Sequence, residues 1–298
     1  GTISADQTIC YSSQPQAIVT GSTPADGTGV ITYRWQASAS TGAGTWANWA
    51  DVGTGASFQP GTLNVTTRYR RFAIATSTIP GSGTATCESA SASNIVTITV
   101  SQQTLPGTIA ANQTICNGEV PQQITSLTGG GGAGNFTYAW QSSTNGTTWS
   151  TDIPGATGAT YQPGSLTSTT HYRRYAISSN GGLTCRSLSP TPSVIITVLQ
   201  PVTTGSITGD QTICMDTVPA LLGSSQEGTG SGNINYRWQS SPTGTNGSWT
   251  TIAGATGATY QPLVQQSRMF YRRITIATFT GVNPAVICES GPTNVIQV

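Results

Sequence analysis

The six cysteines are the residues of this 298-residue chain with the clearest capacity for covalent chemistry. They fall two to each of three related segments, and three of them end the same motif, Gln-Thr-Ile-Cys. Six thiols allow about fifteen pairings in principle, but the repetition predicts bridges within each segment. The predicted pairs are Cys10 with Cys87, Cys116 with Cys185, and Cys214 with Cys288.

The spacing of the cysteines argues against a metal site. Neither a Cys-x-x-Cys motif nor a paired Cys/His spacing is present, so the sequence does not predict zinc. A disulfide in every repeat is typical of proteins in an oxidising compartment, which predicts an extracellular or cell-surface location. Each bridge is expected to connect the first strand of a domain with the start of its last strand, and so to hold the two chain ends together.

Other groups that could support catalysis are sparse. The chain has one histidine, His171, whose equivalents in the other repeats are Arg68 and Phe270. It has no lysine, and its ten acidic residues are scattered without a calcium-loop pattern. Acyl-transfer and Schiff-base chemistry therefore lack a nucleophile paired with a base. We predict that the chain is not an enzyme and uses neither a metal nor a cofactor.

A Tyr-Arg-Arg motif recurs in every repeat. We expect its guanidinium groups to stack on Trp or Tyr rings and to bridge backbone carbonyls; a ligand-binding stripe is the alternative. Tyr69 and Phe72 have opposite parity in the strand, which predicts a β-bulge near Arg70 or Arg71. The pattern leaves open which Arg of each pair faces inward. The pairs are Arg70-Arg71, Arg173-Arg174 and Arg272-Arg273.

Two sets of tryptophans recur as well. The first set lies on an alternating strand and is predicted to fill the core of each domain; it comprises Trp35, Trp140 and Trp238. The second set is placed at equivalent positions before a Gln-Pro turn; it comprises Trp46, Trp149 and Trp249. Trp49 then has no counterpart, and an unshared Trp in a Gly-rich loop is a candidate platform for stacking on a sugar.

The composition excludes several classes of partner. Only 7% of the residues are charged and the net charge is +1, which provides no basic surface for nucleic acid or an anionic membrane. No apolar run approaches the roughly 18 residues that a membrane span needs. Thr and Ser supply the polarity instead, and they suit strands with one solvated face.

The repeat period near 100 residues indicates three tandem domains, at residues 1–103, 104–201 and 202–298. Short strands with turn residues between them, and one central Trp, predict an all-β, immunoglobulin-like β-sandwich for each. The linkers 101–106 and 199–204 are short and contain Pro, so the domains are expected to lie end to end as a rod.

The combined motifs resemble the immunoglobulin-like repeats of very large Bacteroidota surface proteins, the SprB-type gliding adhesins. This resemblance implies type IX secretion, display on the outer surface, and a role in adhesion or gliding motility. It also implies O-glycosylation at Asp216-Thr217-Val218, on Thr217. In the second repeat the matching residues are Gly107-Thr-Ile, Gln113-Thr-Ile-Cys116, Tyr138-Ala-Trp140, Trp149, Tyr161-Gln-Pro163, Tyr172-Arg-Arg174 and Cys185.

These observations predict a structural stalk of a bacterial cell-surface adhesin, whose partners are the neighbouring repeats of a longer chain. One alternative is that the repeats themselves bind surface polysaccharide, with Trp49 as the residue to examine. The other is that the rod is an accessory stalk of a secreted hydrolase.

Overall fold

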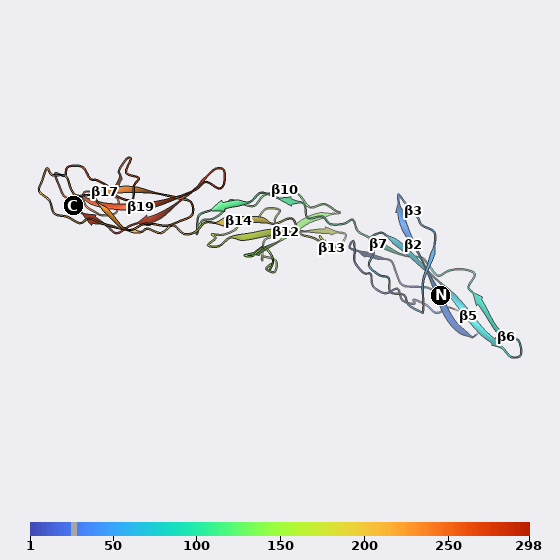
Figure 1. Cartoon of the computed structure of the whole chain (residues 1–298). Helices are drawn as coiled ribbons and strands as arrows, with labels where there is room; N and C mark the ends of the chain where they lie inside the picture. Colours follow the sequence, from blue (N-terminus) through green and yellow to red (C-terminus); the bar gives the residue numbers. More distant parts are fainter. Residues whose placement is uncertain (25–28) are drawn as a thin grey trace.

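The computed structural model describes residues 1–24 and 29–298. The described residues form 21 β-strands and no helix. They build three β-sandwich domains, which lie end to end in an elongated rod with the first and third repeats at its two ends (Figure 1). This arrangement confirms the predicted all-β, tandem immunoglobulin-like architecture.

The second repeat shows the plan of the domain most clearly. One sheet has the order β11-β12-β14-β9, with β13 paired to β12, and the strand pair β8–β10 contributes the opposite layer. A bridge between Ile124 and Tyr161 extends that layer. The strands are β8 (Thr108–Ile109), β9 (Gln113–Ile115), β10 (Ser126–Thr128), β11 (Asn135–Ser143), β12 (Thr170–Asn180), β13 (Leu183–Arg186) and β14 (Val194–Val198).

The first repeat has the same plan with longer strands. Its sheet order is β1-β7-β5-β2-β3, with β4 paired to β2 and β6 paired to β5. The first strand, β1, runs parallel to the last strand, β7, as β9 does to β14 in the second repeat. The strands are β1 (Gln7–Ile9), β2 (Val30–Gly42), β3 (Thr45–Trp46), β4 (Ala50–Thr54), β5 (Thr67–Ile79), β6 (Gly83–Glu88) and β7 (Val96–Val100).

The third repeat is built on β17 and β19. Strand β18 pairs with β17, whereas β20 and β21 both pair with β19. The opposite layer contains the β15–β16 pair. The strands are β15 (Ser206–Thr208), β16 (Gly223–Gln226), β17 (Asn233–Ser241), β18 (Thr250–Thr251), β19 (Phe270–Phe279), β20 (Val286–Pro292) and β21 (Ile296–Gln297).

One tryptophan lies at the centre of each core, as the alternation of its strand predicts. Trp35, Trp140 and Trp238 are each 0% exposed. The indole Nε1 of Trp140 donates a hydrogen bond of 2.9 Å to the carbonyl of Gly158, so its one polar group is satisfied. The ring of Trp140 stacks on Tyr161 at 5.5 Å between centroids.

The prediction of a β-bulge near Arg70 or Arg71 is wrong. β2 and β5 pair in continuous register from Val30–Thr76 to Ala39–Thr67. The parity of Tyr69 and Phe72 differs because Phe72 points outward, where the Arg34 guanidinium lies 4.7 Å from its ring centroid. The bulge was predicted on the assumption that Phe72 faces the core, whereas its ring faces outward and contacts the Arg34 cation.

Candidate functional site

The second arginine of each Tyr-Arg-Arg motif faces the core. In β12 the inward side chains alternate, so Tyr172 and Arg174 share a face, and Arg174 is 0% exposed. Its guanidinium lies 4.2 Å from the ring centroid of Tyr138. The two Nη atoms donate to the carbonyl oxygens of Pro106 and Ala159, among others. Arg71 and Arg273 make the matching contacts, so the predicted stacking and carbonyl bridging is confirmed.

These buried cations are stabilised by hydrogen bonds to backbone carbonyls rather than by ion pairs. Among the described residues, no carboxylate forms an ion pair with Arg71, Arg174 or Arg273. Burial lowers the pKa of the Arg174 guanidinium from its ordinary value, but arginine remains charged in proteins. Because Pro106 precedes the first strand of the second repeat, Arg174 joins the entry of the chain to the core of the domain.

The first arginine of each motif faces outward and lies over a tryptophan. Arg70 stacks on Trp49 at 4.2 Å, and Arg173 and Arg272 stack in the same way on Trp149 and Trp249. Trp49 is therefore the counterpart of those two tryptophans, and the prediction that it is unshared is wrong. The unshared residue is Trp46, which lies in the longer β2–β3 hairpin and stacks on Arg68 at 3.6 Å. A motif count alone cannot locate that insertion.

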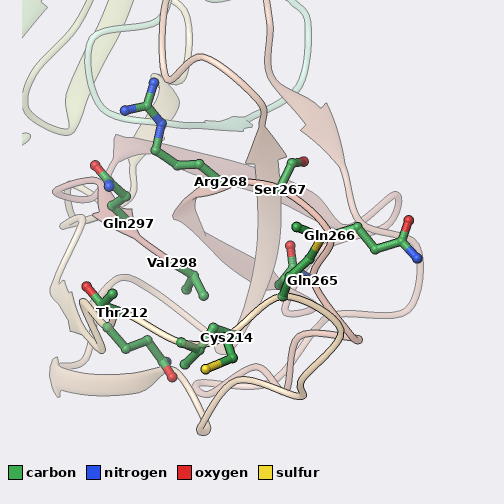
Figure 2. A pocket seen from close by; sticks show the side chains of 11 residues that line it. Thr212, Cys214, Gln265, Gln266, Ser267, Arg268, Gln297 and Val298 are labelled. Atoms are coloured by element: carbon green, nitrogen blue, oxygen red, sulfur yellow. The ribbon is translucent and has the colours of Figure 1, made fainter.

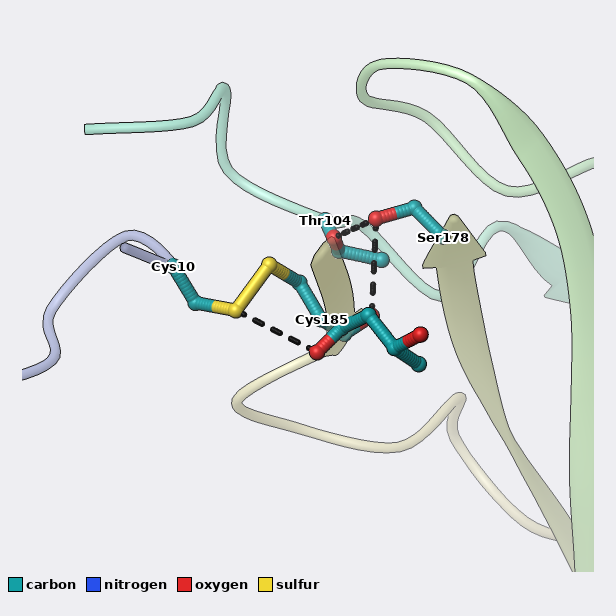
Figure 3. Close-up of a disulfide and its surroundings, with 5 residues drawn as sticks. Cys10, Thr104, Ser178 and Cys185 are labelled. Carbon is teal, nitrogen blue, oxygen red and sulfur yellow. Dashed lines mark hydrogen bonds between the residues drawn. A yellow bond between two sulfur atoms is a disulfide. The ribbon is translucent and has the colours of Figure 1, made fainter. Parts of the chain in front are cut away.

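The disulfides join neighbouring repeats, and the predicted pairing within repeats is wrong. Cys10 of the first repeat bonds to Cys185 of the second, with their Cα atoms 5.5 Å apart. Cys116 of the second repeat bonds to Cys288 of the third, at 5.6 Å. In Figure 3 the loop that carries Cys10 approaches the β12–β13 hairpin, and Cys10 Sγ lies 3.4 Å from the Thr184 carbonyl oxygen. Each bridge thus connects the loop after the Gln-Thr-Ile strand, β1 or β9, to the Cys-bearing hairpin of the next repeat.

The sheet register explains why the two cysteines of one repeat cannot bond. Cys185 pairs with Ser178 of β12, whereas Gln113 of β9 is level with Thr170, because both pair with Ile196. Thr170 and Ser178 are eight residues apart along one strand, which corresponds to about 27 Å. Cys116 lies three residues beyond Gln113, farther away still. A disulfide requires Cα atoms within roughly 7 Å, so each cysteine can only meet a different domain.

An ion pair anchors each Cys-bearing hairpin to its own domain. In the second repeat Arg186, which follows Cys185, pairs with Asp152 at 2.6 Å and lowers the pKa of that carboxyl. In the other repeats the polarity is reversed, because a glutamate follows the cysteine. Such exposed pairs contribute little stability, but they orient the hairpin next to the disulfide. The reversed pairs are Glu88 with Arg34, and Glu289 with Arg237.

The linkers lie against the repeat that follows them. Thr104 is buried, and its hydroxyl lies 2.7 Å from that of Ser178, the residue of β12 that pairs with Cys185 (Figure 3). Leu105 forms a two-way backbone bridge with Gly131 of the Gly-rich loop. Gly107, at φ 70°, approaches the Gly129 carbonyl so closely that a Cβ would clash with it. The backbone linker and the disulfide therefore hold the same end of the second repeat.

The remaining candidate residues lie apart from these junctions or form part of turns. His171 is half-buried in β12 and packs beside Gly146, without a side-chain hydrogen bond within the described part of the chain. Thr217 is exposed, and its hydroxyl donates to the Cys214 carbonyl. Residues 1–24 and 29–298 hold no cluster of three or more metal-ligating side chains. Nor do those residues include an apolar helix of membrane-crossing length.

The chain has distant structural likenesses to other tandem-domain proteins. One is the FN1–FN3 segment of chicken CNTN1, with 11% identity, coverage of 100% of this chain and 96% of that one, and a TM-score of 0.32. A second is the titin segment A168–A170, with 12% identity, coverage of 99% of this chain and 96% of that one, and a TM-score of 0.33. A third is the titin segment I67–I69, with 11% identity, coverage of 96% of this chain and 93% of that one, and a TM-score of 0.35. No curated protein matches the chain at a significant level.

A family model gives the stronger relationship, because it matches almost the whole chain as three consecutive copies. The copies cover residues 1–102, 105–200 and 203–298. Each copy contains one core tryptophan, one buried arginine and two cysteines, which are the features that recur in the three sandwiches. The chain therefore belongs to the family described as "Domain of unknown function (DUF8696)".

Proposed function

We propose that this chain is an extracellular structural rod, the stalk segment of a bacterial cell-surface adhesin. The observation that carries the proposal is that both repeat junctions are crossed twice, once by the backbone and once by a disulfide. A disulfide persists in an oxidising environment, which supports an extracellular location. Covalent connections at every junction serve a molecule that transmits force or holds a fixed extension, and they add nothing to a catalytic site.

The two bridges also enclose overlapping loops, which shortens the chain available for extension. The first loop closes residues 10–185 and the second closes residues 116–288, so both include the segment 116–185. When the ends are pulled, the taut covalent path runs through that segment of about 70 residues and the two terminal segments of about 10 each. Fully extended, this path reaches about 300 Å, compared with roughly 1,000 Å for the reduced chain.

The second repeat bears this load in a favourable direction. Cys116 and Cys185 lie at opposite ends of one sheet, so force between them acts along β9, β14 and β12. Ladder hydrogen bonds lie across the strands, and a force along the strands loads them together rather than one by one. The arrangement therefore supports a role in bearing tension.

Single-molecule pulling on the whole chain tests the mechanical role. With intact disulfides, the total contour length should stop near the length of the taut path, about 300 Å. With reductant, the contour length should increase more than about threefold, because all 298 residues become extensible. Equal contour lengths in the two conditions would contradict the proposal. A protein without inter-repeat bridges would show the long contour length from the start.

The assignment to an adhesin rests on the resemblance to Bacteroidota surface repeats of the SprB type. It includes type IX secretion, display on the outer surface, and a part in attachment or gliding motility. Immunogold labelling of intact host cells with an antibody to this chain should mark the cell exterior. Labelling that appears only after permeabilisation would contradict a surface location.

Polysaccharide binding is a second candidate, because the first repeat presents two adjacent Arg–Trp stacks where the other repeats present one. Trp46 and Trp49 are both half-buried, and each has one ring face under an arginine. The other ring face can stack on a sugar. Host surface polysaccharide should quench tryptophan fluorescence of the whole chain, and the variants Trp46→Ala and Trp49→Ala should each reduce that quenching. Unchanged quenching in both variants would exclude this site.

The Asp216-Thr217-Val218 sequence supports a glycan on Thr217. The Thr217 side chain is exposed and Asp216 occupies a turn with φ 62°, so a modifying enzyme can reach the hydroxyl. Its hydrogen bond to the Cys214 carbonyl can be replaced by water at this exposed position. Intact-mass analysis of protein purified from its host should show added sugar mass on this peptide. An unmodified peptide would refute the assignment.

A further inference from the structure

Two cysteines in this chain have no partner among the described residues, and they are complementary. Cys214 ends the third Gln-Thr-Ile-Cys motif, so it is the counterpart of Cys10 and Cys116. Cys87 lies in the β5–β6 hairpin, so it is the counterpart of Cys185 and Cys288. Both unpaired thiols are exposed. Each existing bridge joins a loop cysteine to a hairpin cysteine, so the chain has one loop cysteine, Cys214, and one hairpin cysteine, Cys87, without a partner among the described residues.

The two thiols belong to the two end repeats of the rod. Cys87 pairs with Ala75 in the hairpin of the first repeat, and Figure 1 places β6 at the extreme end of that repeat. Cys214 lies in the third repeat, beside the last residue, Val298 (Figure 2). The second repeat lies between them (Figure 1). They cannot bond to each other within one chain, so each needs a partner from another domain.

The surface around Cys214 has space and apolar contacts for a partner. A cavity of about 310 Å³ is lined by Ile213, Cys214, Met215 and Val298, together with residues 265–268. Met215 is 71% exposed at the rim.

The contacts of the two existing bridges show what fits such a surface. The loop cysteine Cys116 meets a β-hairpin of the next repeat, and its sulfur lies 3.5 Å from the carbonyl oxygen of Ile287, the residue before Cys288. The loop cysteine Cys10 lies in the same way against the residue before Cys185. Two junctions with different neighbouring sequences thus use one geometry. The residue before Cys87 is Thr86, and it occupies the same place in its hairpin.

We propose that the Cys214 surface docks the Cys-bearing hairpin of another repeat of this family and forms a disulfide with it, so that the ladder of inter-repeat bridges continues beyond this chain. The β5–β6 hairpin, with Cys87, is the complementary group at the other end. In the bonding step, the Cys214 and Cys87 thiols of two molecules lose two protons and two electrons. Glutathione disulfide accepts them and leaves as two molecules of glutathione.

The test uses this chain as the source of both groups. The variant Cys87→Ser retains only the loop thiol, whereas Cys214→Ser retains only the hairpin thiol; both substituted sites are exposed and unpaired, so the fold is unaffected. Each variant is purified without reductant and incubated with glutathione disulfide, alone and as an equal mixture. The products are separated by non-reducing electrophoresis and the bridge is mapped by mass spectrometry.

The proposal predicts that the mixture forms a covalent dimer through Cys214 and Cys87. Each variant alone should form about tenfold less dimer, which corresponds to a docking preference of ~1.4 kcal/mol. The unsubstituted chain should form a ladder of multimers in steps of 30.7 kDa. Equal dimer yields from the mixture and from each variant alone would mean unspecific thiol oxidation, and would overturn the proposal. So would a mixture that stays monomeric while its thiols remain titratable. Neither outcome affects the bridges Cys10–Cys185 and Cys116–Cys288, on which the stalk proposal rests.

Discussion

Cys116 and Cys185 belong to the same sandwich but lie at opposite ends of its main sheet, and each bonds to a different neighbour. The sandwich itself is held by its core tryptophan and buried arginine, without a disulfide of its own among the described residues. The cysteines instead fix the order and spacing of the domains. In this family member the two disulfides therefore connect the domains to one another and do not stabilise the interior of any single domain.

The buried arginine should be necessary for stability of its own repeat. Replacing Arg174 by Met removes the donors to several buried carbonyl oxygens, including those of Pro106 and Ala159. We expect a loss of about 3 kcal/mol in the free energy of unfolding, because each unsatisfied buried acceptor costs about 1–3 kcal/mol. Denaturant unfolding, with hydrogen exchange to assign the change to the second repeat, measures it.

The neighbouring Arg173 provides the matched control. It faces outward, stacks on Trp149 and donates to the Gln141 side chain, so Arg173→Met should cost under about 1 kcal/mol. Arg174→Lys should fall between the two, since one ammonium group retains the charge but cannot reach acceptors on both sides. Equal losses for the Arg173 and Arg174 variants would show that the inward guanidinium has no special role.

The two classes of tryptophan should differ strongly in their effect on stability. Trp140 is fully buried, so Trp140→Ala should destabilise its repeat by roughly 3–5 kcal/mol. Trp49 is half-buried under Arg70, so Trp49→Ala should cost about 1 kcal/mol, the value of an exposed cation–π contact and some lost packing. Denaturant melts of the two variants decide this. A loss at Trp49 as large as that at Trp140 would contradict the assigned burial.

Each repeat should lose stability at high pH through one core tyrosine. Burial raises the pKa of Tyr172 from 10.0 to about 12, and Tyr69 and Tyr271 are raised in the same way. A raised pKa means that the unfolded chain releases this proton first. The stabilisation is therefore complete below pH 10 and is lost as the pH rises from about 10 to about 12. Absorbance of tyrosinate, followed together with circular dichroism, should show that the last of the ten tyrosines to ionise do so as the chain unfolds.

Substitution by phenylalanine isolates this effect. Tyr172→Phe keeps the aromatic ring in the core and removes the ionisable group, so the second repeat should resist unfolding to higher pH than the other two. Hydrogen exchange at several alkaline pH values separates the repeats. An unchanged pH dependence in the second repeat would mean that another group controls its alkaline unfolding.

The sequence predicted the features that depend on local pattern and repetition. The alternation around Trp140 identified the core strand, and the recurrence of Tyr-Arg-Arg pointed to a structural role, both of which the structure confirms. The short edge elements carry no comparable pattern: Tyr161 forms a single isolated bridge with Ile124, and β13 contains only four residues. Short edge strands depend on tertiary pairing more than on composition.

The disulfide pairing could not be read from the same information. Two cysteines in each repeat are compatible with bonds inside a repeat or between successive repeats. The sequence does not show at which end of the sheet each cysteine lies. The parallel pairing of β9 with β14 places Cys116 at the exit of the domain, and the β12–β13 hairpin places Cys185 at the entry. Both placements are long-range features of the fold. The insertion in the β2–β3 hairpin misaligned Trp46 and Trp49 for a similar reason.

Disulfide mapping of the whole chain under non-reducing conditions tests the central claim most directly. Proteolysis at low pH, which prevents exchange between thiols and disulfides, followed by mass spectrometry identifies which cysteine peptides are joined. The account predicts two bridged species, Cys10 with Cys185 and Cys116 with Cys288. Recovery of Cys116 joined to Cys185, both from the second repeat, would contradict the covalent ladder and with it the stalk that it builds.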